Sequence, residues 1–120
     1  DVLHVSRQVG LTGASVLGTR ANFAPWHWAG ADVPKVRRKF RSSLAYRMSL
    51  VAEGRYDAML SLRATWEWDV AAGALIVTEA GGEVSDRRGR ALRFNNPMPQ
   101  VNGVVAAGPM VHEELGRRLV

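Results

Sequence analysis

The sequence predicts an α/β domain built on a layered, mixed sheet flanked by helices. Short apolar segments with the period of strands alternate along the chain with longer segments that have helical spacing. The chain has 120 residues, of which 47% are hydrophobic and 22% are charged, the composition of a globular domain with a single core. We therefore expect one domain over residues 1–120.

The apolar runs and the cysteine content of the chain also predict where the protein is found. No apolar run reaches the roughly 18 to 20 residues needed to span a bilayer, so we expect no membrane contact. The sequence contains no cysteine, which excludes disulfides and thiolate metal sites and fits a reducing compartment. The expected location is the cytoplasm.

The first half of the chain contains one clear helix between strand-like segments. Leu44, Met48 and Val51 follow the i, i+4, i+7 spacing of a helix face, and Gly54 is a suitable end. The expected elements, in order, are a weak strand at 2–5, a strand at 14–19, a loop at 22–34, a helix at 43–53 and a strand at 56–62.

The second half begins with an almost wholly apolar segment that ends in two glycines. An apolar helix without a polar face belongs in a protein interior. Pro109 suits the first turn of a closing helix. The expected elements, in order, are a helix at 69–80, a hairpin with strands at 83–86 and 91–94, a strand at 102–107 and a helix from Pro109.

Asp69 is a carboxylate at the entrance of the apolar helix. If it is buried there it must be capping, paired or metal-bound, because an unpartnered buried charge is too costly. Capping of the helix is the simple alternative. Ala71, Ala72 and Gly73 leave room for a group to approach the first turn, so the segment could form a phosphate or metal site.

The run from Trp68 to Gly82 reads WDVAAGALIVTEAGG and resembles the second signature of the inositol monophosphatase superfamily. Members of this superfamily are magnesium-dependent phosphatases that act on small phosphate esters. The resemblance implies that the chain is the carboxy-terminal half of an inositol monophosphatase-like αβαβα fold. It also implies that Asp69 binds Mg²⁺ and contacts the substrate.

The resemblance extends upstream through residues 42–54. In this superfamily a Gly-Ser segment opens a helix that ends in Val-Ala-x-Gly, and here Ser42 replaces the glycine. The resemblance implies that Ser42 and Ser43 bind the phosphorylated small-molecule substrate. Helix capping by these serines is the alternative.

Residues just before the signature bear on the substrate. Thr65 and Glu67 resemble the bacterial 3'(2'),5'-bisphosphate nucleotidase branch, and Leu62 stands where inositol monophosphatases carry an acidic residue. The resemblance favours 3'-phosphoadenosine 5'-phosphate, with inositol monophosphate or fructose 1,6-bisphosphate as alternatives. Arg41 and Arg63 could clamp a phosphate or remain solvated. Glu67 is expected to be a surface partner of an arginine.

Two motifs of the superfamily, a Glu-Glu pair and Asp-Pro-x-Asp-Gly-Thr, do not occur in the 120 residues. We therefore expect a fragment or processed product that has no catalytic residues of its own and is inactive without an amino-terminal metal-binding domain. An apolar face left by that domain would favour a homodimer. A non-catalytic anion- or nucleotide-binding or interaction module is the alternative. The three histidines have no ligand spacing, and we expect none to bind metal.

A basic cluster contributes to the net charge of +5 and consists of Lys35, Arg37, Arg38, Lys39 and Arg41. Such a cluster is typical of a solvated face, and it can attract small anions. It lacks interleaved aromatic residues beyond Phe40, and the chain has no known nucleic-acid-binding motif. We therefore expect no nucleic-acid partner.

Overall fold

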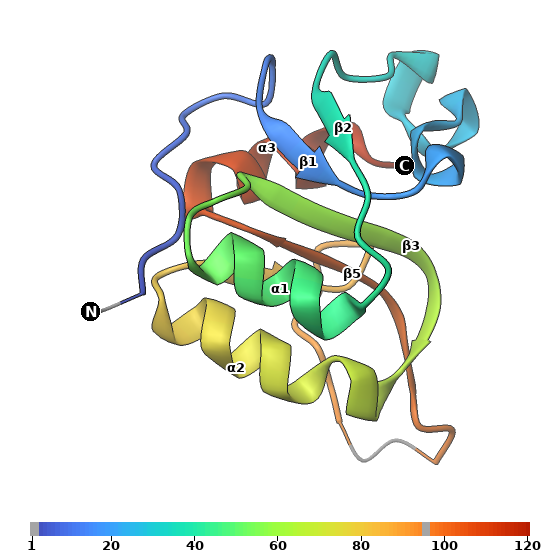
Figure 1. Cartoon of the computed structure of the whole chain (residues 1–120). Coiled ribbons are helices and arrows are strands. Elements are labelled where there is room, and N and C mark those ends of the chain that lie inside the picture. The colour runs from blue at the N-terminus through green and yellow to red at the C-terminus, as the bar shows by residue number, and fades with distance from the viewer. Residues whose placement is uncertain (1–2, 95–96) are drawn as a thin grey trace.

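The computed structural model describes residues 3–94 and 97–120, which form a five-stranded mixed sheet with the order β2-β1-β3-β5-β4 (Figure 1). The strands are β1 (Ser15–Leu17), β2 (Arg37–Lys39), β3 (Ala58–Trp66), β4 (Glu83–Ser85) and β5 (Gln100–Ala107). The α-helices are α1 (Leu44–Ala52), α2 (Ala71–Glu79) and α3 (Pro109–Arg118). β1 is parallel to β2 and β3, whereas β5 is antiparallel to β3 and β4. The predicted fold class is confirmed.

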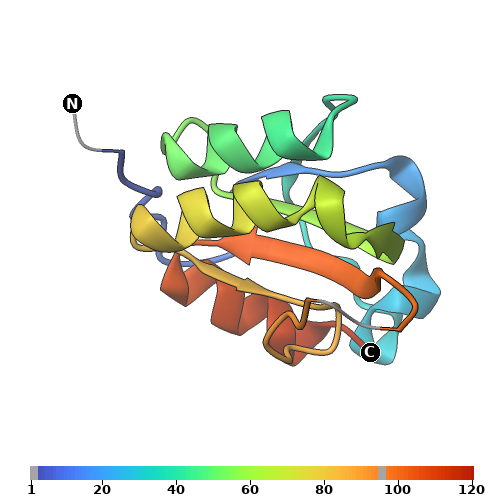
Figure 2. The same cartoon turned by 90° about the horizontal axis from the view of Figure 1, so that it is seen from below.

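Helices cover both faces of the sheet and produce three layers. α1 and α2 lie on one face, and α3 lies on the other (Figure 2). Successive side chains of a strand point to opposite faces, so Met59 packs in the core under α1 and α2 while Ala58 and Leu60 pack in the core under α3. The continuous apolar run of β3 thus reflects burial on both sides.

The segment predicted as a loop at 22–34 forms short 3₁₀ turns that pack on the sheet. The ring of Trp28 is 2% exposed, stacks on Phe23 at 6.1 Å between centroids, and donates from Nε1 to Asn22 O. The Asn22 side chain donates to Leu60 O at 3.1 Å and accepts from Leu62 N at 3.2 Å. These bonds fasten the segment to β3.

Two predicted strands are wrong. Residues 3–5 are not a strand, and residue 2 lies outside the described residues; Val5 is buried and its N–H bonds to Ala80 O at the end of α2. Residues 91–94 are not a strand either. The turn between the two predicted hairpin strands does form, because Asp86 Oδ1 accepts hydrogen bonds from Arg88 N and Arg90 N. β4 then pairs with β5 and not with the segment after the turn.

α2 was predicted to be buried all round, and this is also wrong. Leu75 is 60% exposed and Ile76 is 38% exposed, whereas Gly73, Ala74 and Val77 face the core. Six of the nine residues of this helix are therefore exposed. Within the described residues, no helix is both long and apolar enough to cross a membrane.

Two helical glycines should respond oppositely to alanine. A Cβ on Gly73 would lie 2.6 Å from Met48 Sδ, where α2 meets α1, whereas a Cβ on Gly116 in α3 would meet nothing within 4 Å. We expect Gly73→Ala to destabilise the fold by about 1–3 kcal/mol through overpacking. Gly116→Ala should stabilise it by about 0.5–1 kcal/mol. Urea unfolding of both variants checks this; equal effects of the same sign would contradict the packing described.

His112 should make stability depend on pH. Ser85 Oγ donates to Asp86 O, so it accepts from His112 Nε2 at 2.8 Å. Burial lowers the pKa of His112 from 6.5, and the carboxylate of Glu83 offsets part of this effect. Below pH 6.5 the unfolded chain then binds a proton that the folded chain resists, so the free energy of unfolding should fall as the pH drops below that value.

Urea unfolding between about pH 8 and about pH 5.5 measures this dependence. His112→Gln should show a smaller loss on acidification than the unaltered chain. An identical loss in both proteins would show that His112 does not carry it.

Candidate functional site

The three residues predicted from the sequence to bind substrate line a single cavity of about 370 Å³, named here the Asp69 cavity. It lies where α1 and α2 begin, so the free N–H groups and positive dipole ends of two helices are close to it. Its lining comprises Ser42, Ser43, Leu44, Ala45, Arg47, Arg63, Trp68, Asp69, Ala72 and Gly73.

Ser43 and Ser42 differ in what they do locally. Ser43 is the N-cap of α1, and its Oγ accepts from Tyr46 N at 3.2 Å. The alternative of capping is therefore realised for Ser43. Ser42 is exposed, and its carbonyl oxygen accepts from Arg47 Nη2 at 3.4 Å. Capping by Ser43 fixes the position at which α1 begins, next to the cavity.

Asp69 lies one residue before the N-cap of α2. It ends the 3₁₀ turn η4 (Glu67–Asp69), and the N-cap of α2 is Val70, without a side-chain bond. Asp69 is exposed, so the argument from a buried charge does not hold. Glu67, expected at the surface, is instead buried. Asp69 is nevertheless one of the residues that line the cavity.

Arg47 is a site residue that the sequence reasoning missed. Its side chain is buried, with only 6% exposure, and within the described residues its Nε has no hydrogen-bond partner. The guanidinium lies over the ring of Phe40 at 5.3 Å. Burial lowers the pKa of Arg47, and the like charge of Arg63 lowers it further. Its place four residues after Ser43, on the same helix face, was the available signal.

A second cavity of about 480 Å³ adjoins the first and shares Ser42, Arg47 and Arg63 with it. It adds His27 and Arg87, which come from distant parts of the chain. Arg87 donates to Leu62 O at 2.6 Å, and its Nη2 lies 3.3 Å from His27 Nδ1. Because arginine can only donate, His27 accepts and is neutral. Its pKa is lowered by burial and then by the charge of Arg87.

An exposed aromatic pair borders the Asp69 cavity. The ring of Trp68 is 64% exposed and stacks on Trp66, with 4.7 Å between centroids and 8° between planes. Trp68 lines the cavity and its ring offers a flat aromatic surface at the edge.

Mg²⁺ requires near-octahedral coordination by several oxygen ligands. Within residues 3–94 and 97–120, no group of three or more His, Asp or Glu side chains could hold a metal ion. Asp69 offers a single carboxylate. These residues therefore do not form a complete magnesium site by themselves.

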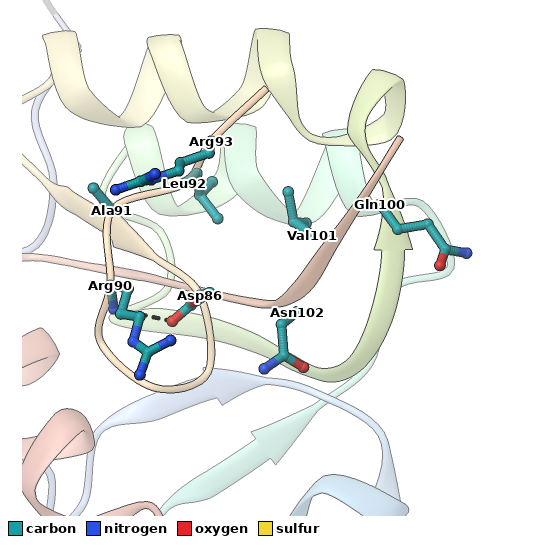
Figure 3. A pocket seen from close by; sticks show the side chains of 8 residues that line it. All are labelled: Asp86, Arg90, Ala91, Leu92, Arg93, Gln100, Val101 and Asn102. Atoms are coloured by element: carbon teal, nitrogen blue, oxygen red, sulfur yellow. Dashed lines mark hydrogen bonds between the residues drawn. The ribbon is translucent and has the colours of Figure 1, made fainter. Parts of the chain in front are cut away.

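Beyond these two adjoining cavities, the residues that the structure describes form further cavities that Ser42, Ser43 and Asp69 do not line. A larger one, of about 590 Å³, lies between the turn after β4 and the start of β5, with Arg90 and Arg93 on the loop and Gln100 on its far side (Figure 3). The carboxylate of Asp86 is already used there to close the turn. Arg41, predicted with Arg63 as a phosphate clamp, lies in a separate cavity and is not at the site.

Comparisons with known proteins agree with the fold and the motif. A model of the inositol monophosphatase family matches residues 3–120. A fructose-1,6-bisphosphatase/inositol-1-monophosphatase of Methanothermobacter thermautotrophicus is 34% identical over 111 residues, which cover 89% of this chain and 38% of that protein. A 3'(2'),5'-bisphosphate nucleotidase of Schizosaccharomyces pombe is 32% identical over 108 residues, covering 86% and 30%.

A solved structure shows the same arrangement. The inositol monophosphatase of Anabaena (Nostoc) is 25% identical, with a TM-score of 0.71, and the match covers 96% of this chain and 46% of that one. The chain therefore spans less than half the length of each of these three proteins.

Proposed function

This chain belongs to the inositol monophosphatase family, and from that membership we propose that it is the substrate-binding half of a phosphomonoesterase that requires Mg²⁺. The preferred substrate in this proposal is a small bisphosphate such as 3'-phosphoadenosine 5'-phosphate. The observation that carries the proposal is the meeting of Ser42, Ser43, Asp69 and two arginines around one cavity.

The cavity has the groups that a phosphate monoester needs. The first turns of α1 and α2 supply free N–H groups, and the Ser42 hydroxyl is an additional donor in the wall. Oriented N–H and hydroxyl groups bind phosphate oxygens well because they are fixed by the fold before the ligand arrives.

The arginines favour a substrate with more than one phosphate. Arg47 is buried, its Nε finds no hydrogen-bond partner among the residues that the structure describes, and Arg63 adds a like charge close to it. An anion between them would relieve both the missing hydrogen bond and the repulsion. Leu62 offers no carboxylate to hold a sugar hydroxyl, and Trp68 offers a face on which a purine could stack.

We propose that Asp69 contributes one carboxylate oxygen to the metal site, and that a metal-binding half of the enzyme contributes the other ligands. When bound, Mg²⁺ in this family neutralises charge at the phosphate and activates water. The residues of this chain bind and orient the ester: the helix ends hold the phosphate, and Arg47 and Arg63 hold the remaining charge. Inositol monophosphate and fructose 1,6-bisphosphate are the competing substrates.

A non-catalytic anion-binding module is the second candidate. It is favoured by the incomplete donor set, since the described residues contain no cluster of metal ligands. Such a module would bind the same anions but would gain no activity when joined to a metal-binding half. We further propose that either this half or a second copy of the chain covers the apolar side chains that α2 exposes.

Binding of the substrate by the chain tests the preference directly. Titration calorimetry should give a dissociation constant for 3'-phosphoadenosine 5'-phosphate at least about tenfold lower than for inositol 1-phosphate, since hydrogen bonds to charged groups contribute about 1.5–3 kcal/mol. Arg63→Leu should remove most of this difference. Equal or tighter binding of inositol 1-phosphate by the unaltered chain would reject the bisphosphate.

A further inference from the structure

A further basic cavity, of about 370 Å³, shares no residue with the Asp69 cavity or with the cavity that adjoins it. It lies between edge strand β2 and the side of α1, and it is named here the β2 cavity. Its lining comprises Ser15, Arg37, Lys39, Arg41, Tyr46, Leu50, Arg55 and Tyr56.

The cations of the β2 cavity come from two separate segments. Arg37 and Lys39 are two residues apart on β2 and therefore point to the same face of the sheet, the face that α1 covers. Arg41 follows the strand, and Arg55 comes from the loop after α1. The fold thus adds Arg55 to three cations of the basic cluster at 35–41.

Arg38, between Arg37 and Lys39, shows the opposite orientation. Its guanidinium lies over the ring of Phe23 at 4.4 Å, and it lines a different cavity with Trp26. Charged side chains on an edge strand prevent aggregation, and they can do so from either face of the sheet. This role does not explain why Arg55, from another segment, lies with Arg37 and Lys39 on the face that α1 covers.

Three of the four cationic groups make contacts that hold them in place, and the set is only partly neutralised. Arg41 donates to Tyr56 Oη at 3.0 Å and lies 5.7 Å from the centre of that ring, and Arg37 Nε donates to Gly13 O at 3.1 Å. Of the nearby carboxylates, Glu53 pairs with Arg55 at 3.1 Å, and Asp57 accepts hydrogen bonds from Ser6 and Ser15. Within the described residues, no carboxylate pairs with Arg37, Lys39 or Arg41.

We propose that the β2 cavity binds a compact polyphosphate anion, such as inorganic triphosphate or the phosphate chain of a nucleotide, at a site separate from that of the substrate. Two or three linked phosphates match several fixed cations within one cavity, and arginine forks bind phosphate oxygens in pairs. The volume suits a small ligand. The tyrosines contribute a hydroxyl and aromatic walls.

Nuclear magnetic resonance titration of the ¹⁵N-labelled chain with inorganic triphosphate tests this site by position. At physiological salt, the amide signals of residues 37–41 and 55–56 should shift and saturate. Lys39→Gln with Arg41→Gln should raise the dissociation constant about tenfold or more, since two charge-assisted bonds are lost. The matched control, Lys35→Gln with Arg38→Gln, removes the same charge from outside the cavity. It should change the dissociation constant of the unaltered chain less than twofold.

Several outcomes would overturn the proposal. Equal weakening in the two double variants would show a diffuse attraction to net charge. Shifts confined to residues around Asp69 would assign all triphosphate binding to the substrate site. Equally tight binding of sulfate, or tighter binding of a single-stranded oligonucleotide of matched charge, would reject a site for a compact polyphosphate. If the first double variant does not fold, Arg55→Gln at the exposed Arg55–Glu53 pair should still weaken binding; unchanged binding would overturn the proposal.

Discussion

Asp69→Asn is expected to lower Mg²⁺-dependent phosphate release on the order of a hundredfold or more, measured in a protein that joins this chain to a metal-binding half. Asparagine keeps the shape of aspartate but removes the charge that attracts the metal. The side chain lies at the cavity beside Trp68 and Ala72, at the start of α2. Loss of this one ligand should therefore affect turnover far more than it affects the fold.

Stability provides the internal control for this prediction. Asp69 is exposed and caps no helix, so Asp69→Asn should change the free energy of unfolding by less than about 0.5 kcal/mol. Glu79→Gln removes an exposed carboxylate from the other end of α2 and should leave turnover unchanged. Full activity of Asp69→Asn would show that this carboxylate is not a metal ligand.

Arg47→Met should weaken the binding of 3'-phosphoadenosine 5'-phosphate about tenfold or more and stabilise the free chain by about 1 kcal/mol. The opposite signs have one cause. Arg47 is buried near Arg63, and its Nε has no hydrogen-bond partner within residues 3–94 and 97–120, so its burial is unfavourable until an anion arrives. Methionine fills a similar volume without these costs.

Calorimetry and urea unfolding measure the two effects in the same samples. Arg7→Met replaces an exposed arginine outside the cavities and should change neither quantity appreciably. A loss of stability in Arg47→Met with unchanged binding would show that Arg47 has a structural role. Residues that bind ligands at a cost to stability are common at functional sites.

Local signals made several elements predictable from the sequence. Helix α1 begins after the capping residue Ser43 and ends before Gly54, whose φ of 77° suits glycine. Pro109 begins α3, as its missing N–H favours. Ser42, Ser43 and Asp69, which line one cavity, could be picked out together because the resemblance to the family covers their positions, with Ser42 in place of the family's glycine.

Long-range contacts decided the features that could not be predicted. The turn η4 is held by a hydrogen bond from Glu67 N to Pro99 O, a partner far along the chain, and so Asp69 precedes α2 without capping it. Similarly, β4 pairs with β5, and residues 91–94 are not a strand in the part of the chain that the structure describes. The guanidinium of Arg47 lies over the ring of Phe40, which is outside α1, so the helix pattern alone could not predict its burial.

The central claim is that this chain supplies the substrate site and one metal ligand of a phosphatase that two halves complete. The most direct test is release of phosphate from 3'-phosphoadenosine 5'-phosphate by the 120-residue chain, alone and fused to the amino-terminal half of the Schizosaccharomyces pombe relative. We expect no Mg²⁺-dependent turnover by the chain alone, and turnover by the fusion that Asp69→Asn abolishes. Turnover by the isolated chain, or turnover by the fusion that Asp69→Asn leaves intact, would contradict this account.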